Sequence, residues 1–358
     1  MPLLLVLLFS IFFCGCGEKK EIAQPSPSEK EADQPADSPA RAQKNGVNVL
    51  TGLPIAESAV KNRPVAVMLN NLKAAQPQFG VSKADIIYEI PAEGGITRML
   101  AVFQSVDGVG NIGSVRSTRS YYLDLVQGLD AILLHAGASP SAYKDIKSRG
   151  VTALDCVKGP YEGSLYWRDK NRIKKAGYEH SVFTSGKRLE KLFSAAVFRK
   201  AHQDGYQYVM RFAGNGTPAS GTPASTIRVK FSNYKTGVFT YEARTGKYNV
   251  SQYGAPYVDG GTGKQVSVSN VLILRTKISI LPGDTAGRLQ VDLIGSGKGS
   301  FACGGKIVDI LWHKPSYAGQ LSYTLMDGTP LILERGSSYV NIVGFAAPVT
   351  VEEASHAS

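Results

Sequence analysis

Residues 1–46 constrain the fold most, because their composition sets them apart from the rest of the chain. The folded part must therefore be built from the remaining residues, about 310, which are enough for a hydrophobic core. An apolar run over residues 2–13 ends shortly before Gly15 and Cys16, and a polar stretch follows directly. A short apolar run, a small residue before a cysteine and an abrupt polar switch are typical of a bacterial lipoprotein signal. The pattern predicts a signal peptide over residues 1–15 and a lipid on Cys16, which would anchor the protein at the extracytoplasmic face of the cell membrane.

Two features leave alternatives open. Cys14 is a second acceptor, but Phe13 before it does not fit a cleavage pocket for small residues, so Cys16 is preferred. No Lys or Arg precedes the apolar run, which favours a translation start further upstream. The run is too short for a membrane span, which needs about 20 residues. Cleaved soluble secretion and a buried apolar N-terminal segment are the remaining interpretations.

The segment over residues 16–46 is rich in Glu, Lys, Pro, Ser and Ala and has almost no large apolar side chain. Such a segment cannot bury enough surface to offset the entropy of ordering it. We therefore expect a disordered stalk, with an end-to-end distance of about 30 Å. Its role would be to let the folded part sample a zone above the lipid surface.

The charge of the chain resides in its folded part. The net charge is +11, and the stalk holds six acids against five bases, so the body carries about +12. Outside a bacterial membrane, such a body is attracted to anionic lipid head groups and wall polymers, although the charge could also serve solubility alone. Nucleic acid is not expected as a partner, because no basic run carries interleaved aromatic residues or a known binding motif.

Only Cys156 and Cys303 remain after the leader. They could form one disulfide or be two small buried residues, and the spacing does not decide between these. Without a CxxC pair or clustered histidines, neither a metal site nor a cofactor is expected.

The stretch 47–212 mixes strand and helix patterns. Runs of β-branched and aliphatic residues predict buried strands, and Gly94-Gly95 predicts a hairpin turn between two of them. Apolar residues at helical spacing predict helices that begin after Ser/Thr residues. The expected strands are 63–70, 84–90, 97–104 and 131–135, and the expected helices are 117–129, 139–147 and 189–201. This pattern indicates an N-terminal domain of mixed α/β layers.

Residues 213–225 contain the pentapeptide Gly-Thr-Pro-Ala-Ser twice in tandem and predict a low-complexity linker. After it, short β-rich runs alternate with Gly-containing turns, and no long helical period appears. These runs are 226–231, 238–241, 266–274, 290–294, 306–312, 320–326, 331–333 and 339–343. The fold class predicted for the whole chain is α+β, with a β-rich C-terminal domain over 226–348 and a tail over 349–358.

Polar functional groups concentrate in the first domain. The candidates for binding an anion are Arg98, Arg116, Arg119, Arg168 and Arg172. The preferred interpretation is a structural salt-bridge network with the acids that flank these arginines in the sequence, Glu89, Glu93 and Asp169, because arginines near acids are often structural.

Two histidines are weaker candidates for a catalytic role. His135 ends a predicted buried strand beside a Gly-containing turn, where α/β layers commonly expose ligands, and His180 follows Glu179. Ser139 and Ser141 lie near His135 in sequence, but adjacency in sequence is poor support for a triad. No motif of a known hydrolase, metalloprotease or P-loop protein appears.

Several motifs stand out along the chain, namely RPVAVMLN at 63–70, ADIIYE at 84–89, EGGITR at 93–98, GSVRSTR at 113–119, HAGASP at 135–140, YWRD at 166–169, NVLI at 270–273, WHK at 312–314 and DG at 327–328. Together they resemble the YerB-like lipoproteins of Gram-positive bacteria. The resemblance covers roughly residues 47–348. It implies a membrane-tethered, two-domain α+β protein with a role in the cell envelope and without an established enzymatic activity. The family pattern also leads us to expect a proline before His180, where this chain has Glu179.

The leading hypothesis is a non-catalytic binding or regulatory factor of the envelope, with an anionic wall polymer, a lipid head group or a cell-wall synthesis protein as its partner. The alternative is an envelope enzyme for a phosphate- or carboxylate-bearing substrate. In that case Arg116 and Arg119 would orient the anion, and His135 or His180 would act as general base. Arginines saturated by neighbouring acids would count against the enzyme.

Overall fold

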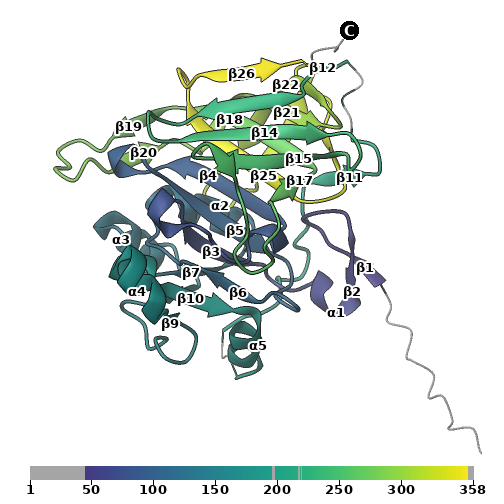
Figure 1. Ribbon diagram of the computed structural model, residues 1–358. Coiled ribbons are helices and arrows are strands. Elements are labelled where there is room, and N and C mark those ends of the chain that lie inside the picture. The colour runs from purple at the N-terminus through teal and green to yellow at the C-terminus, as the bar shows by residue number, and fades with distance from the viewer. Residues whose placement is uncertain (1–44, 196–197, 217, 219, 354–358) are drawn as a thin grey trace, which may run out of the picture. The chain divides into compact units, whose positions relative to one another are not determined.

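A computed structural model describes residues 45–195, 198–216, 218 and 220–353 (Figure 1). The predictions of a signal peptide, of lipidation at Cys16 and of a stalk up to residue 44 lie outside the described residues. Residues 45–46, which we had assigned to the stalk, belong to β1 (Asn45–Val47), which pairs antiparallel with β2 (Pro54–Ala56). No helix in the described part of the chain has the length and apolar character needed to cross a membrane.

An eleven-stranded mixed sheet forms the centre of the molecule. It draws strands from both predicted domains, which we call the N-terminal part (residues 45–212) and the C-terminal part (residues 213–353). From one edge to the other the strands are β12 (Thr222–Pro223), β22 (Lys306–Lys314), β21 (Gly295–Cys303), β18 (Asn270–Thr276), β25 (Ser338–Gly344), β4 (Ile86–Pro91), β5 (Thr97–Phe103), β3 (Val65–Asn70), β7 (Ile132–His135) and β8 (Ala153–Asp155), and β23 (Ser322–Leu325) pairs with β22.

Both faces of this sheet are covered, which explains the continuous apolar runs in the sequence. All six residues of β3 are buried. Because side chains alternate across a strand, Val65, Val67 and Leu69 join one core and Ala66 and Met68 join the other. A strand that is buried on both faces cannot show polar alternation.

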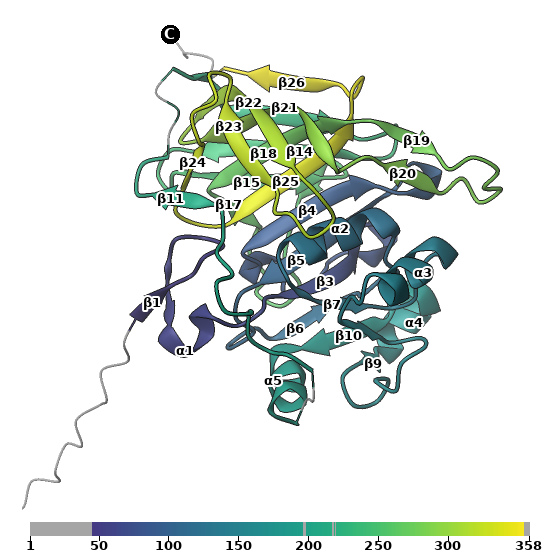
Figure 2. The ribbon, with the colours of Figure 1, turned by 180° about the vertical axis from the view of Figure 1, so that it is seen from behind.

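The two cores have different covers. On the second, α2 (Ser120–Gly128) packs against the sheet (Figure 2). On the first, the N-terminal part contributes a three-stranded sheet and a helix. These are β6 (Asn111–Gly113), β10 (Val182–Ser185), β9 (Trp167–Arg168) and α5 (Gly186–Ala195).

The C-terminal part covers the first core with a six-stranded antiparallel sheet. Its burial alternates along the strands, as one solvated face requires. The strands are β16 (Ala255–Pro256), β15 (Lys247–Gln252), β14 (Thr236–Glu242), β13 (Thr226–Lys230) and β26 (Val349–Glu352), and β17 (Ser267–Val268) pairs with β15.

Shorter elements complete the described chain. The helices are α1 (Glu57–Val60), α3 (Pro140–Ser148) and α4 (Lys170–Ala176). The single turns of 3-10 helix are η1 (Lys73–Ala75), η2 (Val81–Lys83), η3 (Glu93–Gly95) and η4 (Tyr178–His180). Two further strand pairs are β11 (Arg211–Ala213) with β24 (Ile332–Glu334), and β19 (Ile278–Ile280) with β20 (Leu289–Val291).

The predicted fold class is confirmed: a mixed α/β N-terminal part is followed by a β-rich C-terminal part. The hairpin turn at Gly94-Gly95 is present, and both glycines have positive φ values of 71° and 73°. The helix expected over 189–201 instead begins at Gly186 and ends at Ala195, because the backbone of Lys200 and Ala201 pairs with Arg63 and Asn62.

Other segments differ from the sequence predictions in ways that pairing explains. Residues 349–352, which we had assigned to a tail, form β26 because β13 offers them an open edge. The segment 213–225 includes β12, which pairs with β22. Cys156 and Cys303 are both buried and are not joined by a disulfide, and they belong to different cores.

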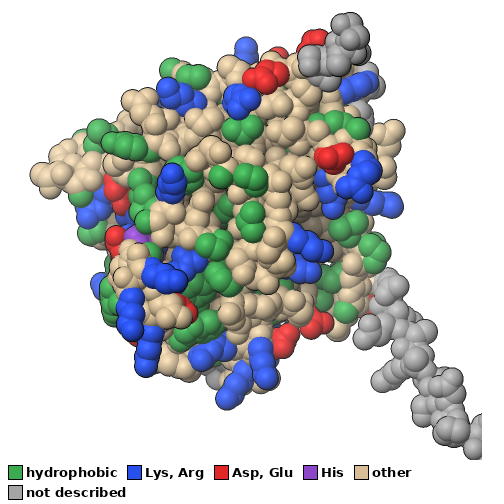
Figure 3. Space-filling model, in the orientation of Figure 1, with side chains coloured by type: hydrophobic (Ala, Val, Ile, Leu, Met, Phe, Trp, Pro, Cys, Tyr) green, Lys and Arg blue, Asp and Glu red, His purple; other side chains and the backbone are tan. Residues whose placement is uncertain are grey.

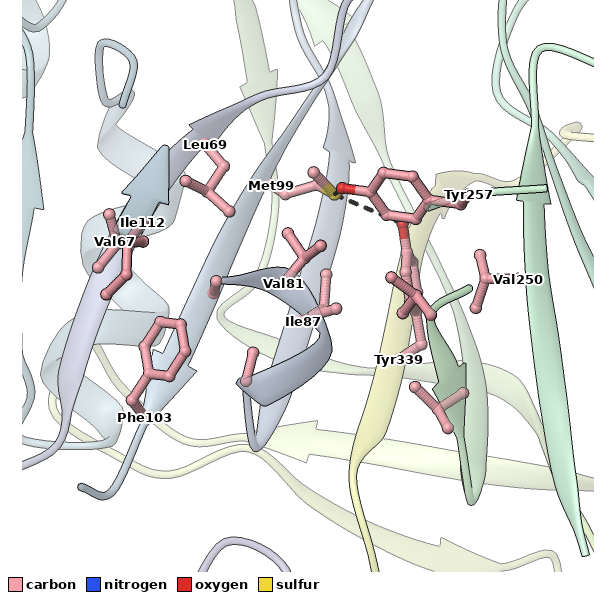
Figure 4. Packing of buried hydrophobic residues seen from close by; sticks show 14 of the residues in the cluster. Val67, Leu69, Val81, Ile87, Met99, Phe103, Ile112, Val250, Tyr257 and Tyr339 are labelled. Atoms are coloured by element: carbon pink, nitrogen blue, oxygen red, sulfur yellow. Dashed lines mark hydrogen bonds between the residues drawn. The ribbon is translucent and has the colours of Figure 1, made fainter. Parts of the chain in front are cut away.

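The two parts interlock rather than touch at a surface. β25 pairs in parallel with β4, so the central sheet runs through both parts. In the first core, the hydroxyls of Tyr257 and Tyr339 both contact the sulfur of Met99, at 3.7 and 3.6 Å (Figure 4). Removing either part would expose the apolar surface of the other.

Candidate anion-binding site

Polar side chains collect at one edge of the central sheet. β3, β7 and β8 run parallel, and β5 runs antiparallel to β3. Asn70, His135 and Asp155 are the last residues of β3, β7 and β8, so they lie at the same end of the sheet. Arg98, the second residue of β5, lies at this end as well. Ligands of open α/β sheets commonly bind beyond the carboxyl ends of parallel strands, so this edge is the place to look for a site.

One carboxylate holds two of the predicted arginines. Glu93, in the turn between β4 and β5, accepts from Arg98 Nη2 at 2.9 Å and from Arg119 Nε at 3.1 Å, and Arg119 Nη2 also donates to it. Burial raises the pKa of Glu93, but the hydrogen bond from Arg119 and the charges of both arginines outweigh it, so the pKa lies below its ordinary value. Glu93 is therefore ionised at neutral pH.

Arg98 is the most deeply buried member of the group. It is 4% exposed, and Nη1 donates to the carbonyl of Ser117 at 2.8 Å. Its Nε atom is buried and has no hydrogen-bond partner among the described residues. Burial and the nearby charge of Arg119 lower the pKa of Arg98 to about 10, so it stays protonated at neutral pH.

The third arginine lies nearer to solvent. Arg116 Nη2 donates to Glu179 Oε2 at 2.5 Å, and the Glu179 side chain is 57% exposed against 20% for Arg116. The hydrogen bond from Arg116 is the main reason why the pKa of Glu179 lies below its ordinary value. The residue that occupies the expected proline position thus supplies the partner of Arg116.

His180 is buried next to the Arg116–Glu179 pair. It is 4% exposed, its Nδ1 lies 2.7 Å from Asn70 Nδ2, and its Nε2 lies 3.4 Å from Glu179 Oε1. Burial lowers its pKa, so the ring is neutral at neutral pH. Because an amide nitrogen can only donate, Nδ1 accepts and the proton of the neutral ring resides on Nε2.

His135 has different partners. It is 1% exposed, its Nδ1 donates to the carbonyl of Gly137 at 2.9 Å, and Asp155 Oδ1 lies 3.7 Å away. Burial lowers its pKa, and its Nε2 has no hydrogen-bond partner among the described residues. Ser139 does not bond to His135. Instead its hydroxyl caps α3 by accepting from Ala142 N at 3.2 Å.

Arg168 and Arg172 lie further out and have their own contacts. Arg168 pairs with Glu162 at 2.9 Å and stacks over the ring of Tyr178 at 3.8 Å. Arg172 Nη1 donates to the carbonyl of Ala75 at 2.5 Å, and burial lowers its pKa. Both side chains also fasten loops, since Arg168 donates to the carbonyl of Tyr178 at 3.3 Å and Arg172 donates to that of Pro77.

Two of the acids expected beside the arginines are used elsewhere. Asp169 caps α4 by accepting from Arg172 N at 2.7 Å. Glu89 is fully buried and lies 3.2 Å from Lys235 Nζ. The sequence did not indicate Glu179 as a partner of Arg116, and only its charge next to His180 could have suggested it.

The arrangement carries positive charge that can hold an anion. Arg98, Arg116 and Arg119, which we call the arginine cluster, form ion pairs with two carboxylates among the described residues, Glu93 and Glu179, so these five groups carry one excess positive charge. Within the described residues, no three His, Cys, Asp or Glu side chains gather closely enough to hold a metal ion. On the face shown in Figure 3, Lys and Arg side chains also gather over the lower part, where α4 and α5 lie.

Comparisons with known proteins give a consistent result. Residues 50–199 match the N-terminal domain, and residues 227–340 the C-terminal domain, of a family described as "Protein of unknown function (DUF3048)". The chain is 33% identical over 305 residues to a Bacillus subtilis (strain 168) protein named "Putative lipoprotein YerB", a match that covers 82% of this chain and 85% of that protein. The crystal structure of YerB from Bacillus subtilis superimposes with a TM-score of 0.74 at 30% identity, covering 85% of this chain and 99% of that one.

Proposed function

The chain belongs to the DUF3048 family of YerB-like proteins, and from this premise we propose that it is a membrane-anchored, extracytoplasmic factor that binds an anionic wall polymer without catalysing a reaction. The anchor is a lipid on Cys16, which the leader pattern predicts. The name of the Bacillus subtilis relative, a lipoprotein, supports this anchoring.

The observation that carries the proposal is the exchangeable partner of Arg116. Arg98 and Arg119 share Glu93 in a buried arrangement, whereas Arg116 pairs with a carboxylate that is more than half exposed. An exposed ion pair contributes about 0–1 kcal/mol, so a phosphate or carboxylate of a ligand can replace Glu179 at little cost. The excess charge of the cluster then favours the ligand.

The body supplies long-range attraction for the same class of ligand. Its net charge of about +12 steers polyanions towards it, and α4 alone carries Lys170, Lys174 and Lys175. A repeating anionic polymer would contact the arginine cluster and this basic surface together.

Nothing in the described geometry favours the enzymatic alternative. His135 and His180 are buried and held by separate partners, and Ser139 is engaged in capping a helix. A general base needs a free acceptor within hydrogen-bond reach of a substrate proton, and the acceptor nitrogen of neutral His180, Nδ1, already accepts from Asn70. Binding is therefore the simpler use of the arginine cluster.

The test measures binding of the full-length lipidated protein, held in neutral-lipid vesicles, to a phosphodiester wall polymer. Arg116→Ala should weaken binding about fivefold, because one cation at an anionic surface contributes about 1 kcal/mol. Arg228→Ala is the matched control, since Arg228 also pairs with an exposed glutamate, Glu352, but lies in the six-stranded sheet.

Equal losses for both variants would mean that charge alone attracts the polymer, and no loss for Arg116→Ala would refute the arginine cluster as the site. Two further arms test other envelope partners. Binding to anionic-lipid vesicles that exceeds binding to the polymer would replace the polymer by a lipid head group. Capture of a cell-wall synthesis protein by the wild type but not by Arg116→Ala would identify a protein, and not the polymer, as the partner.

A further inference from the structure

A groove between α4 and the loop 74–79 leads to a more specific ligand. We infer that this groove binds a sugar ring of an anionic polysaccharide, an inference that rests on the proposed envelope-binding function and names the chemistry of its ligand. The groove measures about 520 Å³, within the range of about 300–1,000 Å³ that is usual for small-molecule sites.

Aromatic rings form its floor. Trp167 stacks on Phe183 with ring centroids 6.0 Å apart and planes at 29°, and Phe79 meets Phe183 edge-on at 5.5 Å. Phe183 is buried, whereas Trp167 and Phe79 are half-buried and line the groove. Phe183 stacks on Trp167 and the Arg188 guanidinium also lies over the ring, so the part of the ring that stays exposed is what a ligand can contact. This part is apolar and suits the C–H face of a pyranose ring.

Polar groups that suit hydroxyls surround this floor. The side chains of Gln76, Asn111, Asn171 and Asp169 line the groove. The Nε2 atom of Gln76 is buried and has no hydrogen-bond partner among the described residues. Amides both donate and accept and a carboxylate accepts, so together they match hydroxyls, which do both. A purely apolar ligand would leave the Gln76 donor unsatisfied.

Charge at the groove selects an anionic sugar over a neutral one. Lys175 lines the groove and is exposed, and the guanidinium of Arg188 lies over the Trp167 ring at 5.0 Å. Arg172 also lines it but donates to backbone carbonyls of the 74–79 loop, so it shapes the wall. A carboxylate- or phosphate-bearing sugar pairs with Lys175 while its ring contacts the exposed part of Trp167.

The two tryptophans of the chain make the groove directly observable. Trp312 is 2% exposed and donates to the carbonyl of Arg275, so a ligand-induced change in fluorescence reports on Trp167. The probe is a set of soluble amino-sugar oligosaccharides that carry carboxylates, titrated into the full-length protein in neutral-lipid vesicles. We expect saturable changes in emission and about tenfold weaker binding by Trp167→Ala in calorimetry.

A second variant protects the test against misfolding. Asn171 is exposed on α4, so Asn171→Ala should leave the thermal transition unchanged and weaken sugar binding about three- to fivefold. Lys298→Ala, an exposed change in β21 of the C-terminal part, should leave sugar binding unchanged.

The outcomes separate this inference from the proposed function. Unchanged emission at high oligosaccharide concentration, or wild-type affinity of Trp167→Ala, overturns the sugar groove even if Arg116→Ala still weakens polymer binding. If Trp167 responds to the sugar while Arg116→Ala has no effect, the groove stands and the arginine cluster falls. If neutral oligosaccharides of the same length bind equally well, the requirement for an anionic sugar is refuted.

Discussion

Two ion pairs of the described chain look alike in the sequence and differ in burial. One joins Glu89 of the N-terminal part to Lys235 of the C-terminal part, and both side chains are at most 1% exposed. The other joins Arg116 to Glu179 at the sheet edge, where the carboxylate is 57% exposed. The first is a structural junction, and the second has the properties of a replaceable contact.

In the junction, hydrogen bonds and a cation surround the buried carboxylate of Glu89. Glu89 accepts hydrogen bonds from Asn71 at 2.8 Å, from Thr97 at 2.6 Å and from the Tyr339 hydroxyl at 2.5 Å. Burial lowers the pKa of Lys235, and Glu89 opposes that shift. Such a pair contributes little net stability over an apolar substitute, yet it penalises any arrangement that separates its members. In the Arg116–Glu179 pair, water solvates the exposed carboxylate, so separating its members costs much less.

Breaking the junction should therefore have the largest effect. Lys235→Met leaves the Glu89 carboxylate buried without its cation and should lower the free energy of unfolding by about 3–5 kcal/mol. Urea denaturation of the variant measures this. The double variant Lys235→Met/Glu89→Gln should recover much of the loss, because no charge remains uncompensated. A loss below about 1 kcal/mol in the single variant would place the junction in the same class as the exposed pair.

A second prediction concerns pH and Asp85, a carboxyl group at the start of the strand that carries Glu89. Asp85 directly precedes β4 and accepts from Gln104 N at 2.6 Å and from Asn48 Nδ2 at 2.9 Å. Burial nevertheless raises its pKa from 3.8 to about 6. Between these values the folded state holds a proton that the unfolded state has lost, so stability falls as pH rises from about 4 to about 6 and then levels off.

Urea denaturation between pH 4 and 7 checks this. The difference in unfolding free energy between the wild type and Asp85→Asn should shrink by up to about 3 kcal/mol across the window, since one pKa unit corresponds to about 1.4 kcal/mol. Asp124, whose pKa burial also raises to about 6, titrates in both proteins and cancels in the difference. A constant difference across the window would show that Asp85 is ionised throughout.

The smallest effect on stability should come from the edge. Glu179→Ala removes an exposed partner and should change the unfolding free energy by less than about 1 kcal/mol, but it should tighten binding of the anionic polymer about fivefold by releasing Arg116. Glu352→Ala is the matched control, because it releases Arg228 in the other sheet. An equal gain in both variants would mean that net charge, and not the position of Arg116, sets the affinity.

The sequence predicted those elements whose signal is local. The run 63–70 is apolar at successive positions because both faces of β3 are buried, and Ser139 caps α3 as its position before the helix indicated. β21 was missed because its residues, Gly295–Cys303, begin with three glycines in five positions. Only pairing makes it a strand, and Gly297 is required there because a Cβ atom would lie 2.6 Å from the Trp312 ring.

The candidate site shows the same division. The sequence indicated the arginines and histidines at one end of the N-terminal strands, since turn and strand signals are local. It could not assign their partners. Glu93 accepts from both Arg98 and Arg119, whereas Glu89 pairs with Lys235 of the C-terminal part and Glu179 pairs with Arg116. Which carboxylate meets which guanidinium depends on loops packed in three dimensions.

By itself the sequence determined the order of strand and helix, the excess of positive charge and the leader pattern that predicts a lipid anchor, because each is written in consecutive residues. Tertiary structure alone decided that β25 lies beside β4 and that Tyr339 bonds to Glu89, 250 positions away. The physical reason is that a strand pattern specifies a face to bury but not the edge on which it pairs. The pairing of β25 with β4 joined the two parts through one sheet, and Arg116 lies beyond the strand ends of that sheet.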